Sequence, residues 1–141
     1  MISTRGRYSI RILLDLAEHQ TDGYLPLKDV AARQEISVKY MERVLPILKK
    51  QGLIHTVHGI GGGYRLAKEP DQITLWEILT LTEGDMAPVS CLQQEAASCH
   101  RAAECRTLPV WRDYYNLTRE YFSGITIADL MQHKPEGNDI I

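Results

Sequence analysis

The sequence lacks any long hydrophobic run. Its most apolar N-terminal stretch, residues 12–16, contains Asp15 and is far shorter than the roughly 20 residues needed to span a bilayer. The stretch is also too short for the core of a signal peptide, and no small-residue cleavage site follows it. We therefore predict a cytoplasmic protein with no membrane partner.

The residue patterns of catalytic sites are missing as well. No nucleophile is paired with a base, and the histidines are scattered along the chain. The glycine-rich run at 59–64 lacks the Lys-Ser/Thr end of a Walker loop, and Tyr64 stands where a dinucleotide fingerprint needs glycine. We interpret this run as the turn of a hairpin, and we predict neither an enzyme nor a small-molecule substrate.

Basic residues are scarce in the second half of the chain. Residues 1–68 contain eleven Lys/Arg against six Asp/Glu, whereas residues 69–141 contain five against twelve. The formal net charge of −2 therefore hides a basic half and an acidic half. This asymmetry indicates that the first half binds a polyanion, with chance clustering of surface charge as the alternative.

The first half contains the elements of a winged helix-turn-helix in the right order. Apolar residues recur at helical spacing in three segments, and Ser37 can cap the third of them. Two strand-like segments then flank the glycine run. The predicted elements are helices at 7–19, 28–34 and 38–51 and strands at 53–57 and 64–68.

This order predicts a protein that places its third helix in the major groove of DNA and its hairpin on the adjacent backbone or minor groove. Polar side chains at the start of that helix are long enough to reach phosphates or base edges. The candidate DNA contacts are Ser37, Lys39, Tyr40, Glu42 and Arg43 on the helix and His58, Gly59, Gly61 and Gly62 on the wing. A winged-helix adaptor whose basic face binds an acidic protein is the alternative.

The second half is predicted to be a loop and a long helix. A capping box at Thr74–Glu77 opens a short helix that closes near Gly84. The predicted division is a DNA-binding domain at 1–84, a cysteine-bearing sensor loop at 85–107, a long and a short helix at 108–132 and a loose tail at 133–141. The fold class is mainly α with a small β-hairpin wing.

Only three cysteines are present, and all fall in the predicted loop at Cys91, Cys99 and Cys105. An odd number in a cytoplasmic protein argues against a disulfide framework. Thiolates are soft donors that suit iron–sulfur clusters, zinc or copper(I), and the spacing is wider than that of a structural zinc knuckle. A metal-free redox switch and inert thiols are the other interpretations.

Several segments resemble the bacterial winged-helix family that contains IscR, NsrR and CymR. The resemblance covers nearly the whole chain, and its most specific parts are the GGGY wing and the three-cysteine loop. The similar segments are 3–17, 27–37, 40–54, 59–68, 73–79, 110–111 and 125–130.

The resemblance implies a homodimer on a palindromic double-stranded operator, with the long C-terminal helix crossing between subunits. A stripe of mostly aromatic residues on the 108–123 segment agrees with this dimerisation role. The implied interface residues are Trp111, Tyr114, Tyr115, Thr118, Tyr121 and Phe122. His58 departs from the family, because IscR has an arginine there that enters the minor groove, and Ile60 replaces a wing-tip proline.

The resemblance also implies that Cys91, Cys99 and Cys105 bind an iron–sulfur cluster, of the 2Fe–2S or the 4Fe–4S type. The fourth ligand is open, because Leu108 replaces the histidine of IscR and Tyr8 stands near the place of the aspartate of NsrR. Other donors within reach are His100, Glu95, Glu104 and Asp85. The expected function is a DNA-binding transcription regulator that senses cluster status, with a CymR-like cysteine-metabolism repressor or a metal-free thiol sensor as alternatives.

Overall fold

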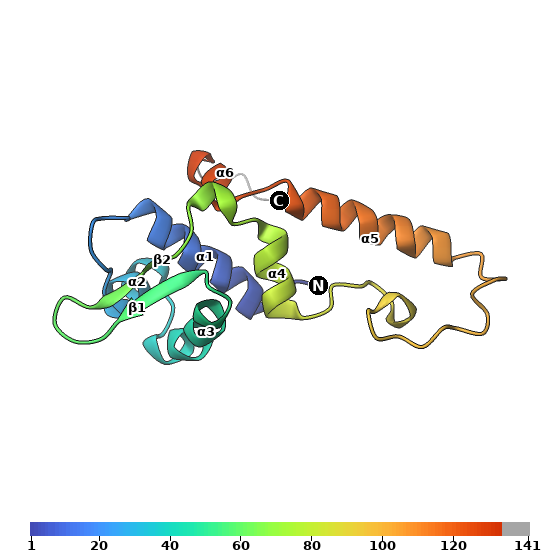
Figure 1. Ribbon diagram of the computed structural model, residues 1–141, viewed down its shortest axis with the longest axis horizontal. Helices are drawn as coiled ribbons and strands as arrows, with labels where there is room; N and C mark the ends of the chain where they lie inside the picture. The colour runs from blue at the N-terminus through green and yellow to red at the C-terminus, as the bar shows by residue number, and fades with distance from the viewer. Residues whose placement is uncertain (134–141) are drawn as a thin grey trace.

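The structure is a computed structural model that describes residues 1–133, so all but the first residue of the tail predicted at 133–141 lies outside the described residues. Figure 1 shows a packed head from which one long helix projects. The α-helices are α1 (Thr4–Glu18), α2 (Leu27–Gln34), α3 (Val38–Lys50), α4 (Leu75–Glu83), α5 (Leu108–Ser123) and α6 (Ile127–Gln132). The strands are β1 (Ile54–Val57) and β2 (Gly63–Leu66), and single 3-10 turns are η1 (Pro70–Gln72) and η2 (Ser90–Leu92). The predicted fold class, mainly α with a hairpin wing, is confirmed.

Helices α1, α2 and α3 form the helix-turn-helix. Helix α1 starts at Thr4, three residues before the predicted start, because the Ser3 hydroxyl accepts a hydrogen bond from the Gly6 amide and caps it. Ser37 caps α3 in the predicted way and accepts from the Tyr40 amide at 3.1 Å. Between α2 and α3 the chain turns through Glu35, whose φ of 54° lies in the left-handed region.

Strands β1 and β2 form the wing. They pair antiparallel with Ile54 opposite Leu66 and Val57 opposite Gly63. The wing is tied to the head because Leu25 and Tyr64 exchange two backbone hydrogen bonds of 2.8 Å. At Gly63 a Cβ atom would lie 2.2 Å from the Leu25 carbonyl oxygen, so this close approach requires glycine.

Helix α4 carries half of the predicted capping box. The Thr74 hydroxyl accepts from the Glu77 amide, as expected. The Glu77 carboxylate, however, accepts from Lys68 Nζ at 3.1 Å. The reciprocal bond to the Thr74 amide is not among the hydrogen bonds of residues 1–133, and Glu77 ties the helix to the end of the wing instead.

The hydrophobic core lies between α1, α3, α4 and the wing, and α6 joins it. Ile127 of α6 is fully buried, and backbone hydrogen bonds of 2.9 Å join Ile127 to Ile73 and Leu75 to Ile125. We call residues 3–83 together with 125–132 the head, and residues 84–124 the arm. None of the arm residues is buried. In residues 1–133, no helix has the length and hydrophobicity to cross a bilayer.

Candidate DNA interface and cysteine loop

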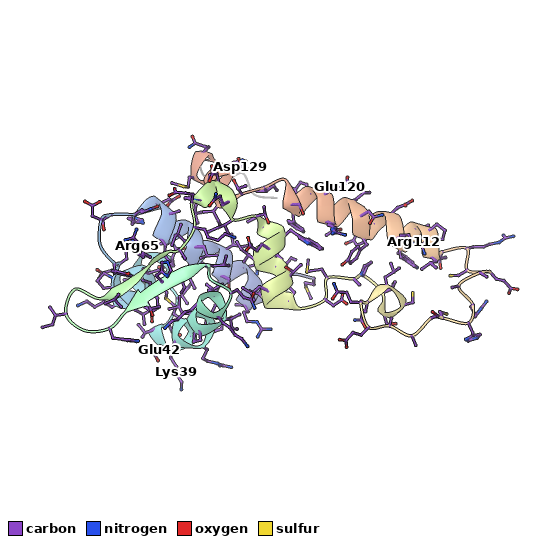
Figure 2. The ribbon with its side chains drawn as sticks, in the orientation of Figure 1. Lys39, Glu42, Arg65, Arg112, Glu120 and Asp129 are labelled. Atoms are coloured by element: carbon purple, nitrogen blue, oxygen red, sulfur yellow. The ribbon has the colours of Figure 1, made fainter. Side chains whose placement is uncertain are left out.

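The exposed side of α3 carries three of the candidate DNA contacts. Lys39, Glu42 and Arg43 are all exposed. Figure 2 shows Lys39 and Glu42 projecting together away from the body of the head. Ser37 lies at the start of the same helix, where its hydroxyl is engaged as the cap. The exposed side of the helix therefore presents charged groups of both signs.

Tyr40 differs from its neighbours because it is half-buried. Its ring packs edge-to-face on Tyr8 of α1, with ring centroids 5.5 Å apart and an interplanar angle of 77°. The Arg11 guanidinium lies over the other ring of this pair, 4.9 Å from the Tyr8 centroid. Tyr8 therefore joins α1 to the first turn of α3, a contact that the sequence pattern did not indicate.

Asp15 is fully buried in α1 and fixes α2, the other helix of the motif. Both of its carboxylate oxygens accept from Arg33, with the closest contact at 2.7 Å, and Gln34 Nε2 donates at 2.8 Å. Arg11 in turn donates to the side chain and the backbone carbonyl of Gln34. The hydrogen bond that Arg33 donates to Asp15 is the main cause that raises the pKa of Arg33. A charged network thus sets the orientation of α2 against α1.

The wing tip is open to solvent. His58, Gly59 and Gly61 are exposed, and the two glycines adopt φ values of 97° and 75°. Ile60 is also fully exposed at the tip. Gly62 is half-buried, and a Cβ there would lie 2.2 Å from the Val57 carbonyl oxygen, so this position of the turn requires glycine. The turn can therefore approach another surface closely.

The three cysteines lie on the arm and carry free thiols. Cys91 and Cys99 are exposed, and Cys105 is half-buried, three residues before the start of α5 at Leu108. Among residues 1–133, no three Cys, His, Asp or Glu side chains converge as metal ligands would. The donor chemistry fits a soft metal, but the loop would have to rearrange to bring the three sulfur atoms together.

Cys105 has a distinct environment. Its sulfur lies 3.5 Å from the Thr107 hydroxyl. That hydrogen bond, with further ones to the Thr107 and Leu108 amides and the positive charge of Arg101, lowers the pKa of the Cys105 thiol. The local hydrogen bonds at the start of α5 therefore favour the thiolate form of Cys105 relative to a free cysteine.

The loop begins at two anchored acidic residues. Asp85 accepts from the amides of Ala87 and Gln94 at 2.9 Å and so caps the first turn of the loop. Glu83, at the end of α4, accepts from both the amide and the hydroxyl of Ser3 at 2.9 and 2.7 Å. The beginning of the loop thus contacts the start of α1 through Ser3 and Glu83, which are 80 residues apart in the sequence.

Helix α5 presents two faces. On one face Tyr115 packs edge-to-face on Trp76 of α4, and Phe122 packs against the core cluster. On the other face Tyr114, Leu117 and Tyr121 are 58%, 66% and 65% exposed. Trp111 is also exposed and Thr118 is half-buried. The predicted interface residues are therefore divided between contacts to the head and a large exposed apolar surface.

Comparison with known proteins identifies the family. A model described as "Rrf2: Iron-dependent Transcriptional regulator" matches residues 2–133. The chain belongs to the Rrf2 family. The resemblance found in the sequence is thereby confirmed.

Named members of the Rrf2 family match over most of their length. The HTH-type transcriptional regulator IscR of Aliivibrio salmonicida is 34% identical over 130 residues, which cover 92% of this chain and 76% of that protein. The solved structure of CymR, the global cysteine regulator of B. subtilis, matches with a TM-score of 0.76 and 30% identity over 96% of this chain and 98% of that one. The structure of T. potens IscR matches with a TM-score of 0.73 and 30% identity, covering 96% and 93%.

These Rrf2-family matches decide the class of function. The chain is a winged-helix transcription regulator and not an enzyme, as the sequence predicted. Regulation of transcription by this family implies DNA binding. The matches include both an IscR and a CymR, so they agree on the family and differ in the regulator that they name.

Proposed function

We propose that this protein is a homodimeric regulator of the IscR type that binds a palindromic operator and senses an iron–sulfur cluster held by Cys91, Cys99 and Cys105. The observation that carries the proposal is the arm: three free thiols on an exposed loop lead directly into a helix that has no buried residue. Such an arm has the donors for a cluster and the surface for a second subunit.

The exposed face of α5 supports the homodimer. Tyr114, Leu117 and Tyr121 recur at intervals of three and four residues, so they line one side of the helix. A second copy that packs its own α5 on this stripe forms a self-complementary interface with twofold symmetry. Two heads related by that symmetry fit the two half-sites of a palindrome.

The donor set supports the cluster. Cys91, Cys99 and Cys105 would supply three thiolates, and a bound cluster would couple iron and redox status to the order of the 85–107 loop. Among the other candidates, Asp85 is already engaged in capping the loop, and Tyr8 is packed in the head against Tyr40. His100, Glu95 and Glu104 are exposed on the loop and remain the candidates for the fourth ligand.

The test is anaerobic purification followed by an absorption spectrum and counts of iron and sulfide. We expect a coloured protein with visible charge-transfer bands, and loss of the bands in the variant with Cys91, Cys99 and Cys105 changed to Ala. The matched control is Ser90→Ala with Ser98→Ala on the same loop, which should keep colour and iron. A colourless, iron-free wild type after anaerobic reconstitution would reject the cluster.

A second candidate is a CymR-like regulator or a thiol switch without metal. The lowered pKa of Cys105 favours it, because the thiolate is the form that oxidises. The two candidates differ in the metal-free protein. A thiol switch should change its operator affinity on peroxide treatment and recover with a reductant, whereas the cluster regulator should respond only after cluster loading.

The salt dependence of binding separates both candidates from a protein-binding adaptor. DNA binding should weaken steeply as salt rises and should favour one palindrome over random duplex, because phosphate contacts release counterions. An adaptor would show no such preference among duplexes.

A further inference from the structure

We propose that the groove between the first turn of α1 and helix α3 binds a phosphate of the DNA backbone, and that Arg5 and Arg43 are its ligands. The proposal rests on the proposed DNA-binding function and deepens it. It adds a contact from α1, outside the recognition helix, and it assigns Arg43 to the backbone instead of the base edges.

The groove has a volume of about 370 Å³ and a positive character. Arg5 and Arg43 are its only charged lining residues, and both are exposed. None of the ion pairs within residues 1–133 involves either guanidinium. The remaining lining residues are Ser3, Thr4, Tyr40, Val44 and Ile47. Two arginines that share one groove without a carboxylate among its lining residues are suited to an anion.

The position of the groove divides α3 into two stripes. Tyr40, Arg43, Val44 and Ile47 are spaced as i, i+3, i+4 and i+7, so they share the side of the helix that faces the start of α1. Lys39 and Glu42 are absent from the groove, and they project outward in Figure 2. The outward pair is placed to meet base edges, whereas the groove stripe lies at the flank, where a DNA strand passes.

The walls of the groove are fixed before any ligand binds. Ser3 is held by two hydrogen bonds to Glu83, and Tyr40 is held by the ring of Tyr8. Arg7, the next arginine along α1, donates to the Thr4 hydroxyl at 3.2 Å. Arg5 and Arg43 are thus left to form the bidentate contacts that guanidinium groups make with phosphate oxygens.

The experiment compares two duplexes over a range of salt concentrations. One duplex is a palindrome selected from a random pool by the wild-type protein, and the other is a scrambled sequence of equal composition. Arg5→Gln and Arg43→Gln should each weaken binding to both duplexes by the same factor, on the order of tenfold. The slope of log K against log salt should become shallower by about 0.9 for each protomer.

Matched variants separate this effect from other losses. Glu42→Gln should alter the ratio between the two duplexes, because a base-edge contact carries sequence information. Arg5→Lys should retain the salt dependence of binding and lose part of the affinity. Lysine keeps the positive charge but cannot form the bidentate hydrogen bonds of a guanidinium group. Arg112→Gln is the control for charge alone, because Arg112 lies on α5 far from α3 in Figure 2. The thermal midpoints of the Arg5 variants should equal that of the wild type.

Three outcomes would overturn the assignment. If the wild type binds the selected duplex and Arg5→Gln binds it equally well, α1 makes no phosphate contact. If Arg43→Gln changes the ratio between duplexes as Glu42→Gln does, Arg43 reads bases. If the wild type binds no duplex in a salt-dependent way, the DNA-binding proposal itself fails, and this inference fails with it.

Discussion

The head and the arm of this protein are built on different principles. Within residues 1–133, every buried hydrophobic residue belongs to the head, where α1, α3, α4, the wing and α6 share one core. The arm has no buried residue, although α5 is 16 residues long. A helix of that length is marginal in water without packing on one face. The head is therefore stabilised by contacts within its own chain, whereas the arm depends on what covers it.

The largest expected effect comes from a matched pair of leucines. Leu13→Ala removes a fully buried side chain from the head and should lower the free energy of unfolding by about 3–5 kcal/mol. Leu117→Ala removes an exposed one from the arm and should change unfolding of the head by less than about 0.5 kcal/mol. Urea denaturation at one dilute protein concentration measures both. Equal losses would mean that the arm is part of the same core.

The next effect concerns two ion pairs within the head. Asp15→Asn leaves Arg33 without its carboxylate partner and should lower the free energy of unfolding by about 2 kcal/mol. This loss is smaller than for a wholly buried pair, because the Arg33 side chain is partly exposed. Glu77→Gln breaks the partly exposed pair with Lys68 and should cost less than about 1 kcal/mol.

The same urea titrations, repeated in high salt, provide the check on the two ion pairs. High salt should reduce the loss of stability caused by Glu77→Gln and leave most of the loss caused by Asp15→Asn. The reason is that Asp15 is buried, whereas both partners of the Lys68–Glu77 pair are partly exposed. An Asp15→Asn protein as stable as the wild type would show that the network on α2 adds no stability.

The sequence predicted the elements of both regions well, because local signals determine them. Ser37 begins α3 as its N-cap, and Gly84 ends α4 as its C-cap. Helix α5 occupies the predicted residues 108–123. The apolar pattern of helix α1 begins only at Tyr8 and so predicts a later start than the structure has, because the cap that begins the helix is Ser3. Local patterns therefore located the head, the loop and the long helix.

Contacts between residues far apart in the chain could not be predicted from the sequence. Asp15 lies within an apolar stretch, and its partners Arg33 and Gln34 are 18 and 19 residues away. The Ser3–Glu83 link is longer still, and no periodicity indicates it. The three cysteines were correctly placed on one loop, but spacing alone does not determine whether their sulfur atoms converge. Pairing across elements depends on the packed fold and not on any one segment.

A smaller effect would sharpen the description of the core. The Ser9 hydroxyl is buried in α1 and has no hydrogen-bond partner among the described residues. Ser9→Ala should therefore raise the free energy of unfolding by about 0.5–1 kcal/mol, because it removes an unsatisfied polar group and favours the helix. Thermal denaturation measures the change. A loss of stability would show that the hydroxyl is bonded in solution, for example to a buried water molecule.

The smallest effect probes the junction of the two regions at Cys105. The Thr107 hydroxyl is the main cause that lowers the pKa of this thiol, so Thr107→Val should raise it. Because the thiolate is the reactive form, alkylation of Cys105 by iodoacetamide at neutral pH should slow by roughly two- to threefold, and its pH profile should move to higher pH. The measurement uses metal-free protein in which Cys91 and Cys99 are changed to Ser, so that one thiol reacts.

Thr118→Val is the control for that measurement, because Thr118 bonds only the Tyr114 carbonyl within α5. It should leave the alkylation profile of Cys105 unchanged. If Thr107→Val also leaves the profile unchanged, the start of α5 does not set the chemistry of the last cysteine. The loop would then act independently of the helix that follows it. If the pH profile of alkylation shifts, the Cys105 thiol and the first turn of α5 are coupled. A chemical change at Cys105 would then directly affect the helix on which the dimer is proposed to form.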